Sequence, residues 1–582
     1  MRLFSQLGWY FLTEWRRYLG AIVLLIFIAL LQIIPPRLVG SIIDGISKQT
    51  MNINQLIGWI SVMILIAFII YGLRYVWRLW LFGASYKLAI QLRQKFYRQF
   101  SQQTQEFYLR HRVGDLIART TNDVDRVVFA AGEGVLTLVD SLVMGCAVLI
   151  VMSIEISWQL TLFSLLPMPI MAIIIKQYGE QLYTRFKSAQ CAFSALNNHA
   201  QESLTSIRMI KAFGLEEHQS YQFEMAALEA GRKNMHVAEV DAKFDPTIYI
   251  AIGAANFLAV AGGSWMVLHN KMTLGDLTSF VMYLGLMTWP MLALAWMFNI
   301  VERGSAAYSR ICILFEERPT IINGKQSLRQ QAGQLSVNVR QFIYPGATTS
   351  SLNNIVFNIQ PGQLIGICGP TAAGKSTLLS LLQRHFDVNY GEILFQSIGL
   401  TNIKQEEWRA RLAVVNQIPF LFSDTIAGNI ALGKPHASQT EIEEAAKLAE
   451  VHEDILRLPG GYNTQVGERG IMLSGGQKQR ISIARALLLN TEILILDDAL
   501  SAVDGQTENR ILKNLRQWRG CHTIIISAHR LSALVDSDQI LVLQQGAILC
   551  QGTHQQLIAK PGWYRDMYCY QQIEASLDKE HE

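Results

Sequence analysis

Long hydrophobic runs fill the first 300 positions of this chain, which has 582 residues in all. A transmembrane helix needs about 20 consecutive, mostly apolar residues, and six runs are long enough. We therefore predict a helical membrane domain over residues 1–310. Its six candidate spans are Leu19–Pro36, Leu56–Tyr75, Gly134–Ser153, Trp158–Lys176, Pro246–His269 and Leu277–Ile300.

The connections between these spans are of two kinds. Short connections join spans one and two, three and four, and five and six, whereas more than fifty residues follow spans two and four. Tyr86–Phe107 and Ala192–Phe213 have helical apolar spacing, so we expect the flanking spans to continue past the bilayer as helices. The turns at Leu109–Ile117 and Gly214–Ser220 would then contact the C-terminal domain, and solvated hairpins are the alternative.

Basic residues indicate the orientation of the membrane domain. Nine lysines and arginines lie between Arg78 and Arg126, in the long connection after span two, and Arg2, Arg16 and Arg17 precede span one. The short connections hold few basic residues. Because lysine and arginine are enriched on the cytoplasmic side, the pattern predicts a multi-pass protein with both termini and both long connections in the cytoplasm.

Two features within the spans are candidates for contact with a transported molecule. Asp140 lies inside span three, where an ionisable group usually faces a cavity or a partner. A substrate or cation contact and a structural hydrogen bond are both open for it. Span six is rich in methionine and aromatic residues, such as Met287 and Trp289. These can re-pack around varied apolar ligands, but lipid-facing packing explains them equally well.

The residues after Arg310 have the composition of a soluble protein. We interpret 311–335, which contains Pro319 and Gly324, as a linker, and 336–575 as a domain of alternating short strands and helices. The net charge of +4 gives no reason to expect a nucleic-acid partner. The seven cysteines are scattered without a C-x-x-C pair, which argues against a disulfide framework or a zinc site.

A phosphate-binding loop stands inside this second domain. The pattern G-x-x-x-x-G-K-S begins at Gly369, directly after an apolar strand, Leu364–Cys368, and leads into a helix, Ser376–Arg384. In that context backbone N–H groups bind nucleotide phosphates. Lys375 would neutralise the β- and γ-phosphates and Ser376 would bind Mg²⁺. The predicted nucleotide-binding residues are Gly369, Pro370, Thr371, Ala372, Ala373, Gly374, Lys375, Ser376 and Thr377.

A second apolar strand, Glu492–Leu496, ends in the acidic pair Asp497 and Asp498. Asp497 fits the Walker B role of holding Mg²⁺, directly or through water. The two motifs together predict an α/β P-loop NTPase domain that uses ATP and Mg²⁺ as its cofactors.

The sequence LSGGQ follows at Leu473–Gln477, about a hundred residues after the phosphate-binding loop. With it, the chain resembles the ATP-binding cassette (ABC) exporters over its full length. The order of six spans and one cassette is similar to that of bacterial half-transporters of the type IV, B-subfamily-like architecture. The resemblance implies a place in the bacterial inner membrane. It also implies that each ATP is shared between two cassettes, so that a single chain cannot work alone.

The resemblance implies further site roles. Tyr344 corresponds to the aromatic residue that stacks on adenine, and Gln417 to the glutamine that senses the γ-phosphate and Mg²⁺. His529 corresponds to the switch histidine, Ser501–Asp504 to the D-loop, and Val466–Gly470 to the loop that contacts the coupling helices. The signature residues, which would cap the γ-phosphate bound by the other cassette, are Ser474, Gly475, Gly476 and Gln477.

Asp498 departs from the family pattern, in which a catalytic glutamate follows the Walker B aspartate. Aspartate is one methylene shorter, and a misplacement of about 1 Å can cost on the order of 10²-fold in rate. We therefore expect Asp498, acting with Gln417 and His529, to catalyse slowly. The intact signature would complete a competent site on a partner that carries the glutamate. A heterodimer is the expected assembly, and a slow homodimer is the alternative.

The expected function is ATP-driven export of drugs or other amphipathic small molecules. A lipid flippase would use the same ATP-hydrolysing cassette and is one alternative. An ATP-gated channel or a regulatory ATPase is another, because slow hydrolysis is also natural for these classes. The expected partners are a second half-transporter with a catalytic glutamate, membrane lipids and an amphipathic substrate, with no nucleic acid.

Overall fold

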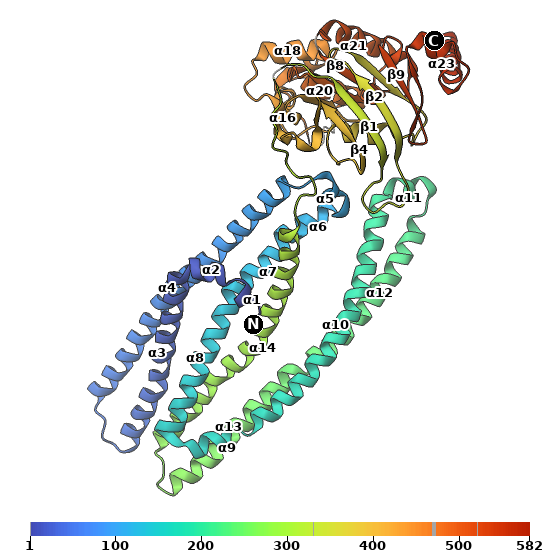
Figure 1. Cartoon of the computed structure of the whole chain (residues 1–582). Helices are drawn as coiled ribbons and strands as arrows, with labels where there is room; N and C mark the ends of the chain where they lie inside the picture. Colours follow the sequence, from blue (N-terminus) through green and yellow to red (C-terminus); the bar gives the residue numbers. More distant parts are fainter. Residues whose placement is uncertain (1, 330, 468–472, 521, 582) are drawn as a thin grey trace. The chain divides into compact units, whose positions relative to one another are not determined.

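The computed structural model describes residues 2–329, 331–467, 473–520 and 522–581. The chain divides into two compact units (Figure 1). The first comprises Met1–Gln99 and Gly114–Glu317, and the second comprises Phe100–Val113 and Arg318–Glu582. The predicted combination of a helical domain and an α/β domain is confirmed, with a short segment of the N-terminal half joining the second unit.

The first unit is made of helices. They are α1 (Arg2–Gln6), α2 (Gly8–Thr13), α3 (Trp15–Ser47), α4 (Ile53–Ser101), α6 (Val113–Ala118), α7 (Val124–Phe129), α8 (Val135–Val151), α9 (Trp158–Ser164), α10 (Pro167–Thr205), α11 (Ile207–Phe213), α12 (Glu216–Asp241), α13 (Phe244–Leu268) and α14 (Leu274–Glu316), with π-helical turns η1 (Arg119–Asp123), η2 (Ala130–Gly134) and η3 (Met152–Ser157).

Within the described residues, five continuous helical segments are long and apolar enough to cross a membrane. They contain predicted spans one, two, three and six, and all but the last residue of span five; the segments are Trp15–Ser47, Ile53–Ser101, Val113–Ser164, Glu216–Leu268 and Leu274–Glu316. The fourth predicted span, Trp158–Lys176, falls on α9 and α10, which are separated at Leu165 and Leu166. It is not among the five segments, so the number six stays a prediction.

The helices extend well beyond the length that a bilayer requires, as the periodicity predicted. Helix α4 has 49 residues, about 74 Å at a rise of about 1.5 Å per residue. Helices α10 and α12 run side by side, and Arg185 forms an ion pair with Glu239 at 3.1 Å between them. The short helix α11 ends at Gly214, whose φ of 65° gives a left-handed cap.

The first predicted turn is divided between the two units, with residues 109–113 in the second and 114–117 in the first. Helix α5 (Gln105–Arg110) lies within Phe100–Val113. Its N-cap residue, Thr104, shares a hydrogen bond of 2.9 Å with Thr320 between their hydroxyl groups. This placement agrees with the expectation that the turn after span two contacts the ATPase domain.

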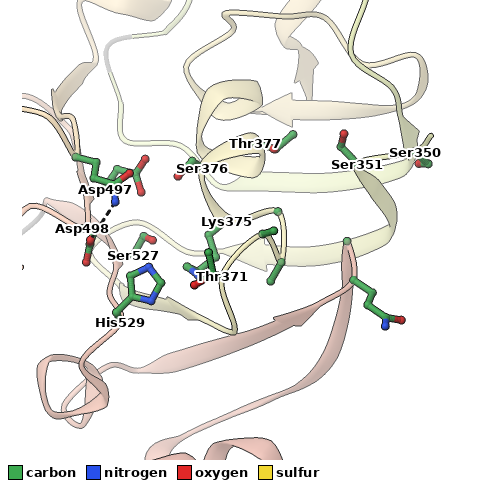
Figure 2. A pocket seen from close by; sticks show the side chains of 16 residues that line it. Ser350, Ser351, Thr371, Lys375, Ser376, Thr377, Asp497, Asp498, Ser527 and His529 are labelled. Atoms are coloured by element: carbon green, nitrogen blue, oxygen red, sulfur yellow. Dashed lines mark hydrogen bonds between the residues drawn. The ribbon is translucent and has the colours of Figure 1, made fainter. Parts of the chain in front are cut away.

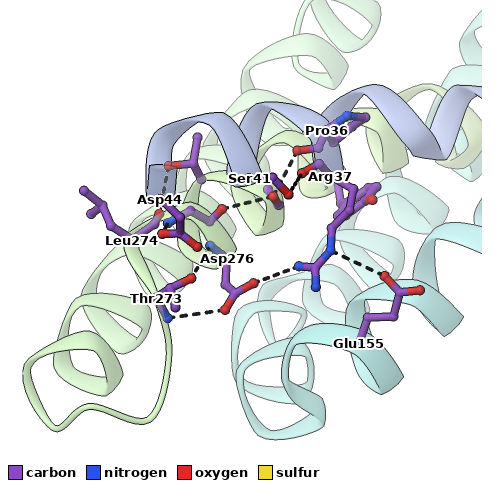
Figure 3. A network of polar contacts seen from close by, with 12 residues as sticks. Pro36, Arg37, Ser41, Asp44, Glu155, Thr273, Leu274 and Asp276 are labelled. Atoms are coloured by element: carbon purple, nitrogen blue, oxygen red, sulfur yellow. Dashed lines mark hydrogen bonds and ion pairs between the residues drawn. The ribbon is translucent and has the colours of Figure 1, made fainter. Parts of the chain in front are cut away.

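Helices α3 and α14 approach closely where α14 begins (Figure 3). A Cβ on Gly40 would meet the Gly275 carbonyl oxygen at 2.5 Å. The Gly275 N–H donates to Asp44 Oδ1 at 2.7 Å, and Arg37 Nη1 pairs with Asp276 Oδ1 at 2.7 Å. The first turn of α14 is therefore fixed on α3 by small residues and by charge.

The second unit is an α/β domain. Its helices are α5, α15 (Lys375–Leu382), α16 (Gln405–Arg409), α17 (Ile426–Ile430), α18 (Gln439–Leu448), α19 (His452–Leu456), α20 (Gly475–Leu488), α21 (Gly505–Trp518), α22 (His554–Ile558) and α23 (Trp563–His581), with 3-10 turns η4 (Leu400–Asn402), η5 (Ala431–Gly433), η6 (Gly461–Asn463) and η8 (Leu531–Leu534). Its strands are β1 (Leu335–Phe342), β2 (Leu352–Ile359), β3 (Leu364–Cys368), β4 (Tyr390–Phe395), β5 (Ile398–Gly399), β6 (Leu412–Val415), β7 (Ile493–Asp497), β8 (Thr523–Ser527), β9 (Gln539–Gln544) and β10 (Ala547–Gly552).

The strands form two sheets. One has four strands in the order β2-β1-β4-β5, and the other has six in the order β10-β9-β3-β8-β7-β6. In the larger sheet β3, β8, β7 and β6 are parallel neighbours. Alternate residues of β3 enter two different hydrophobic cores, Leu364 and Cys368 on one face and Ile365 and Ile367 on the other. This two-sided burial explains why the strand is a continuous apolar run.

The boundary between the domains differs from the prediction. Helix α14 continues to Glu316, past the change in composition at Arg310. The later part of the predicted linker joins the second unit, where Gln326 pairs with Ile403 as an isolated parallel bridge. The linker is therefore partly the end of a helix and partly a segment attached to the ATPase domain.

Candidate nucleotide-binding site

The phosphate-binding loop follows β3 and ends at α15, as predicted. Gly369 has a φ of 145° and Gly374 a φ of 100°. A Cβ on Gly369 would collide with the Leu543 carbonyl oxygen, and a Cβ on Gly374 would lie 2.7 Å from the Leu352 side chain. Both glycines are thus required by the loop conformation. Ala372 adopts a φ of 64°, which is uncommon for a residue with a side chain.

Lys375 is turned back onto its own loop. Its Nζ donates to the carbonyl oxygens of Gly369 at 2.8 Å and Pro370 at 3.0 Å. The side chain is buried, and burial lowers its pKa, although Cys368, Asp498 and Asp497 act in the opposite direction. A buried ammonium held only by neutral carbonyls gains from an anionic partner, which is what a nucleotide phosphate would supply.

Asp497 ends β7, beside the phosphate-binding loop. The strand lies parallel to β8 with Asp497 opposite Ser527, and β8 lies parallel to β3. Because the carboxyl ends of parallel strands meet at one edge of a sheet, the Walker B carboxylate and the loop come together there. Burial raises the pKa of Asp497, and the nearby Ser376 and Ser527 hydroxyls partly offset this effect.

Asp498 is held by its neighbours on several sides. Its backbone has a φ of 49°, a left-handed conformation that aspartate tolerates better than most residues. The Asp498 N–H donates to the Ser527 carbonyl oxygen at 2.9 Å, and the Asp498 carbonyl oxygen accepts from Ser501 Oγ at 2.9 Å. Gln417 Nε2 donates to its carboxylate Oδ2 at 3.3 Å. The position that the family fills with glutamate is therefore fixed and faces Gln417.

These residues surround one cavity of about 630 Å³ (Figure 2). The structure brings together most of the residues predicted for one nucleotide: Thr371, Ala372, Ala373, Gly374, Lys375, Ser376, Thr377, Gln417, Asp497, Asp498 and His529. Gly369 and Pro370 adjoin it through the carbonyl oxygens that hold Lys375. The volume is within the range of about 300–1,000 Å³ found for ligand pockets.

Tyr344 lies beside this cavity rather than in its lining. Its hydroxyl donates to Thr377 Oγ1 at 3.1 Å. Its ring stands edge-on to those of Phe342 and Phe386, with centroids 5.0 Å and 5.2 Å away. Phe342 and Phe386 are buried, so the partly exposed ring of Tyr344 is the one that a nucleotide base could reach.

The signature residues lie outside the lining of the cavity, among the residues described. Ser474 is the N-cap of α20 and forms a capping box with Gln477, with N–O distances of 3.1 Å and 3.2 Å. A Cβ on Gly476 would meet the Ala502 carbonyl oxygen of the D-loop at 2.9 Å. The signature is therefore formed and packed against the D-loop, and a second cassette would have to use it. Of the predicted loop Val466–Gly470, residues 468–470 lie outside the described residues.

The switch histidine belongs to a segment held from two sides. His529 lines the cavity, and the amide of Gln571 on α23 bridges its carbonyl oxygen at 2.9 Å and the Leu531 N–H at 2.8 Å. On the other side, Arg530 forms an ion pair with Glu508 at 3.0 Å. Burial raises the pKa of Glu508, and Arg530 opposes that shift.

Sequence reasoning did not identify five cavity residues, which are Ser350, Ser351, Ser527, Gln545 and Gly546. Ser527 could have been found, because it ends an apolar strand two residues before His529. The others come from the β1–β2 and β9–β10 turns, which no local motif connects to the phosphate-binding loop.

The residues present fit ATP with Mg²⁺. Ser527 is buried in the lining of the cavity near Asp497, and the Lys375 ammonium is held by carbonyl oxygens. Ser376 and Asp497 supply the hard oxygen ligands that Mg²⁺ prefers, with Gln417 at the same cavity.

Comparison with known proteins agrees with the fold and the motifs. A family model described as "ABC transporter transmembrane region" matches residues 18–291, and one described as "ABC transporter" matches residues 352–501. The solved "Structure of a bacterial Atm1-family ABC exporter with ATP bound" superposes with a TM-score of 0.79 at 26% identity, covering 96% of this chain and 98% of that one.

Two curated relatives match nearly end to end. The chain is 66% identical to the "Multidrug resistance-like ATP-binding protein MdlA" of Escherichia coli (strain K12), over 99% of this chain and 98% of the relative. It is 39% identical to the "Probable multidrug resistance ABC transporter ATP-binding/permease protein YheI" of Bacillus subtilis (strain 168), over 98% and 97%. The chain therefore belongs to the ABC transporter family, as an exporter half-transporter that joins a helical membrane domain to an ATP-hydrolysing cassette.

Proposed function

We propose that this chain is one half of a heterodimeric exporter of the bacterial inner membrane, and that it carries the slower of two ATP sites. The observation on which the proposal depends is Asp498, which occupies the position of the catalytic base and hydrogen-bonds to Gln417 at 3.3 Å. The carboxylate has the right chemistry for a general base but sits on a side chain one methylene too short.

The rate of hydrolysis depends on how close the Asp498 carboxylate comes to the attacking water. A base must come within hydrogen-bond distance of the water that it activates, and loss of about 1 Å can cost on the order of 10²-fold. Asp498 cannot compensate by shifting freely, because its backbone is tied to Ser527 and Ser501. Its own site would therefore bind ATP well and hydrolyse it slowly.

The need for a second cassette is supported by the separation of the two motifs. The cavity is lined by the Walker residues of this chain without Ser474–Gln477. A partner's signature would close this chain's site, and this chain's intact signature would close the partner's. We propose that the partner is a second half-transporter with a catalytic glutamate.

The roles of this chain's residues follow from their contacts. Lys375 would release the Gly369 and Pro370 carbonyls to pair with the β- and γ-phosphates, and Ser376 and Asp497 would hold Mg²⁺. The metal would neutralise phosphate charge during transfer. Gln417 would pass from Asp498 to the γ-phosphate, and His529 would stabilise the charge that develops there.

Transport would follow from the closing of the cassettes. ATP must bind the closed pair better than the open pair, since a ligand shifts an equilibrium only by its differential affinity. The membrane helices would then alternate between a cavity open to the cytoplasm and one open to the other side. The basic residues of the long connections support cytoplasmic termini.

We propose amphipathic compounds, drugs among them, as the substrates. The support is twofold: the full-length relatives at 66% and 39% identity have multidrug names, and a cavity in the membrane unit is lined by both aromatic and charged side chains. A lipid flippase and an ATP-gated channel remain outcomes of the test rather than proposals.

Uptake by inside-out vesicles that contain the chain with its partner half tests the function. We expect ATP-dependent accumulation of amphipathic dyes against a gradient, with Lys375→Ala in this chain slowing uptake without abolishing it. Movement of fluorescent lipids between leaflets without dye uptake would indicate a flippase. ATP-dependent flow only down a gradient would indicate a channel.

A further inference from the structure

A second cavity, of about 430 Å³, lies within the membrane unit. It is bounded by α3, α4, η2, α8 and α14, which all belong to the first unit; the four α-helices are labelled in Figure 1. Four charged side chains line it: Arg74 and Arg78 from α4, and Glu133 and Asp140 from η2 and α8. The cavity wall thus carries two positive and two negative groups, with no net charge.

The charges are separated by sign. Arg74 and Arg78 are four residues apart on α4, which places them on one face about 6 Å apart along the helix axis. Glu133 and Asp140 are seven residues apart, about two helical turns, and also share a face. One wall of the cavity is therefore basic and the facing wall is acidic.

The two walls are not joined by direct ion pairs. Arg78 acts electrostatically on Glu133 and Arg74 on Asp140. Yet among the described residues none of the four charged groups forms an ion pair within 4.0 Å or a side-chain hydrogen bond. Elsewhere in the same unit, by contrast, Arg310 binds Asp123 with two hydrogen bonds, of 2.6 Å and 2.9 Å. Charges within a membrane domain are costly without a partner. A molecule in the cavity could therefore form ion pairs with the arginines on one wall and with the carboxylates on the other.

The apolar part of the lining is aromatic. Trp289 and Trp296 of α14 are 61% and 48% exposed, and Trp77 of α4 is buried. The Arg78 guanidinium lies 5.7 Å from the Trp77 ring centroid, within the range of cation–π contact. Exposed, flat side chains next to charged ones suit a ligand with an aromatic body and polar ends.

We propose that this cavity binds an amphipathic zwitterion with an aromatic body. Its anionic group would lie against Arg74 and Arg78, its cationic group against Glu133 and Asp140, and its body against the tryptophans. A simple cation would leave the arginines uncompensated and be repelled by them, and a simple anion would meet the carboxylates in the same way. That this zwitterion is a transported substrate rests on the proposed export function. That it binds in the cavity rests only on the residues of the lining.

Four forms of one dipeptide test the inference. Phenylalanyl-phenylalanine is a zwitterion at pH 7, its methyl ester is a cation, its N-acetyl derivative is an anion, and the N-acetyl methyl ester is neutral. Equilibrium binding of the tritiated forms is measured on the chain with its partner half in lipid nanodiscs, without nucleotide. We expect the zwitterion to bind about tenfold more tightly than either singly charged form, the gain of one further charge-assisted hydrogen bond.

Paired neutral variants separate recognition from structure. With Glu133→Gln and Asp140→Asn together, the N-acetyl form should become the best ligand, and with Arg74→Gln and Arg78→Gln together, the methyl ester should. Arg185→Gln with Glu239→Gln, which removes an ion pair on α10 and α12, should leave the order unchanged. Equal binding of all four forms, no binding of any, or equal weakening of all four in both cavity variants would overturn the proposal.

Vesicle uptake distinguishes a failure of this inference from a failure of the exporter function. Preferential binding of the zwitterion without ATP-driven uptake of any compound would reject export and keep the cavity assignment. ATP-driven uptake of dyes, together with no charge preference in dipeptide binding, would keep export and reject the assignment.

Discussion

The side-chain amide of Gln417 donates a hydrogen bond to the carboxylate of Asp498, with 3.3 Å between Nε2 and Oδ2. This contact joins the residue expected to sense the γ-phosphate to the residue expected to act as base. Gln479 lies behind the pair, with Nε2 3.4 Å from the Gln417 carbonyl oxygen and Oε1 accepting from the Ala502 N–H at 3.0 Å. Gln417, the D-loop and the helix of the signature are thus connected through one buried side chain, that of Gln479.

Substitutions in the signature of this chain should lower the ATPase activity of the heterodimer more than substitutions in its own phosphate-binding loop. Ser474→Ala removes a helix cap, worth about 1 kcal/mol, and also a hydroxyl that would meet the partner's γ-phosphate. We expect ATPase activity of the heterodimer to fall at least about tenfold, as when a transition-state donor is lost.

Ser438 provides a matched control for that variant. It caps α18 with the same capping-box geometry, closed by Glu441, and Ser438 is itself exposed and outside the lining of the cavity. Ser438→Ala should lower stability by a similar amount and leave turnover nearly unchanged. Equal loss of activity in the two variants would mean that Ser474 acts only as a cap.

The hydrogen bonds from Gln571 to the segment of His529 and Leu531 should affect ATP hydrolysis when this chain's own site is active. Gln571→Ala removes the hydrogen bonds to the carbonyl of the exposed His529 and to the N–H of the buried Leu531, and each such hydrogen bond contributes about 0.5–1.5 kcal/mol. In an Asp498→Glu background we expect a lower kcat with little change in KM for ATP. Gln572→Ala, an exposed neighbour on α23, is the control and should have no effect.

As the pH falls, the binding of Mg²⁺ should begin to weaken at a higher pH than it would if the metal ligand were an aspartate of ordinary pKa. Burial raises the pKa of Asp497, and a metal ligand must be ionised. Protonation therefore competes with Mg²⁺ as the pH falls through the raised pKa. Titrations of Mg²⁺ in the presence of ATP at several pH values test this.

Asp497→Asn isolates the contribution of that carboxyl group. The variant keeps the titration of the nucleotide phosphates and should bind Mg²⁺ more weakly at every pH. The difference between the two curves should shrink towards low pH. A constant difference would show that Asp497 stays ionised and that burial does not control it.

The close crossing of α3 and α14 should make Gly40 essential for stability. A Cβ there would meet the Gly275 carbonyl oxygen at 2.5 Å and would collide with the Ser279 hydroxyl. Such overpacking costs about 1–3 kcal/mol, so Gly40→Ala should lower the thermal unfolding temperature. Gly58→Ala on α4, where nothing lies within 4 Å, should leave it unchanged or raise it slightly; equal behaviour of both would contradict the crossing.

The nucleotide site was the most predictable part of the molecule, because its motifs are contiguous in sequence. The predicted strand Leu364–Cys368 is β3 itself. The predicted strand Glu492–Leu496 is shifted to Ile493–Asp497, since Asp497 still pairs with Ser527 in the sheet. The signature was also recognised, and its absence from the lining of the cavity fits the expectation that it serves another cassette.

The features that depend on packing were harder to predict. The sequence predicts span four as one apolar run, but Pro167 stands at the start of α10, where proline favours a new helix over the continuation of α9. Arg78 is among the basic residues that predict a cytoplasmic connection, and the structure places it with Asp140 in one cavity lining. In span six, Met287 and Met297 are buried, so packing accounts for part of its methionine content.

The most direct test of the proposed slow site is ATP hydrolysis by the purified chain in lipid, alone and with its partner half, each with and without Asp498→Glu. The account predicts that the chain alone is nearly inactive, that the partner restores turnover, and that the glutamate raises the activity of the chain alone by at least about tenfold. Brisk hydrolysis by the chain alone, little changed by Asp498→Glu, would show that Asp498 is an adequate base and would contradict the proposed asymmetry.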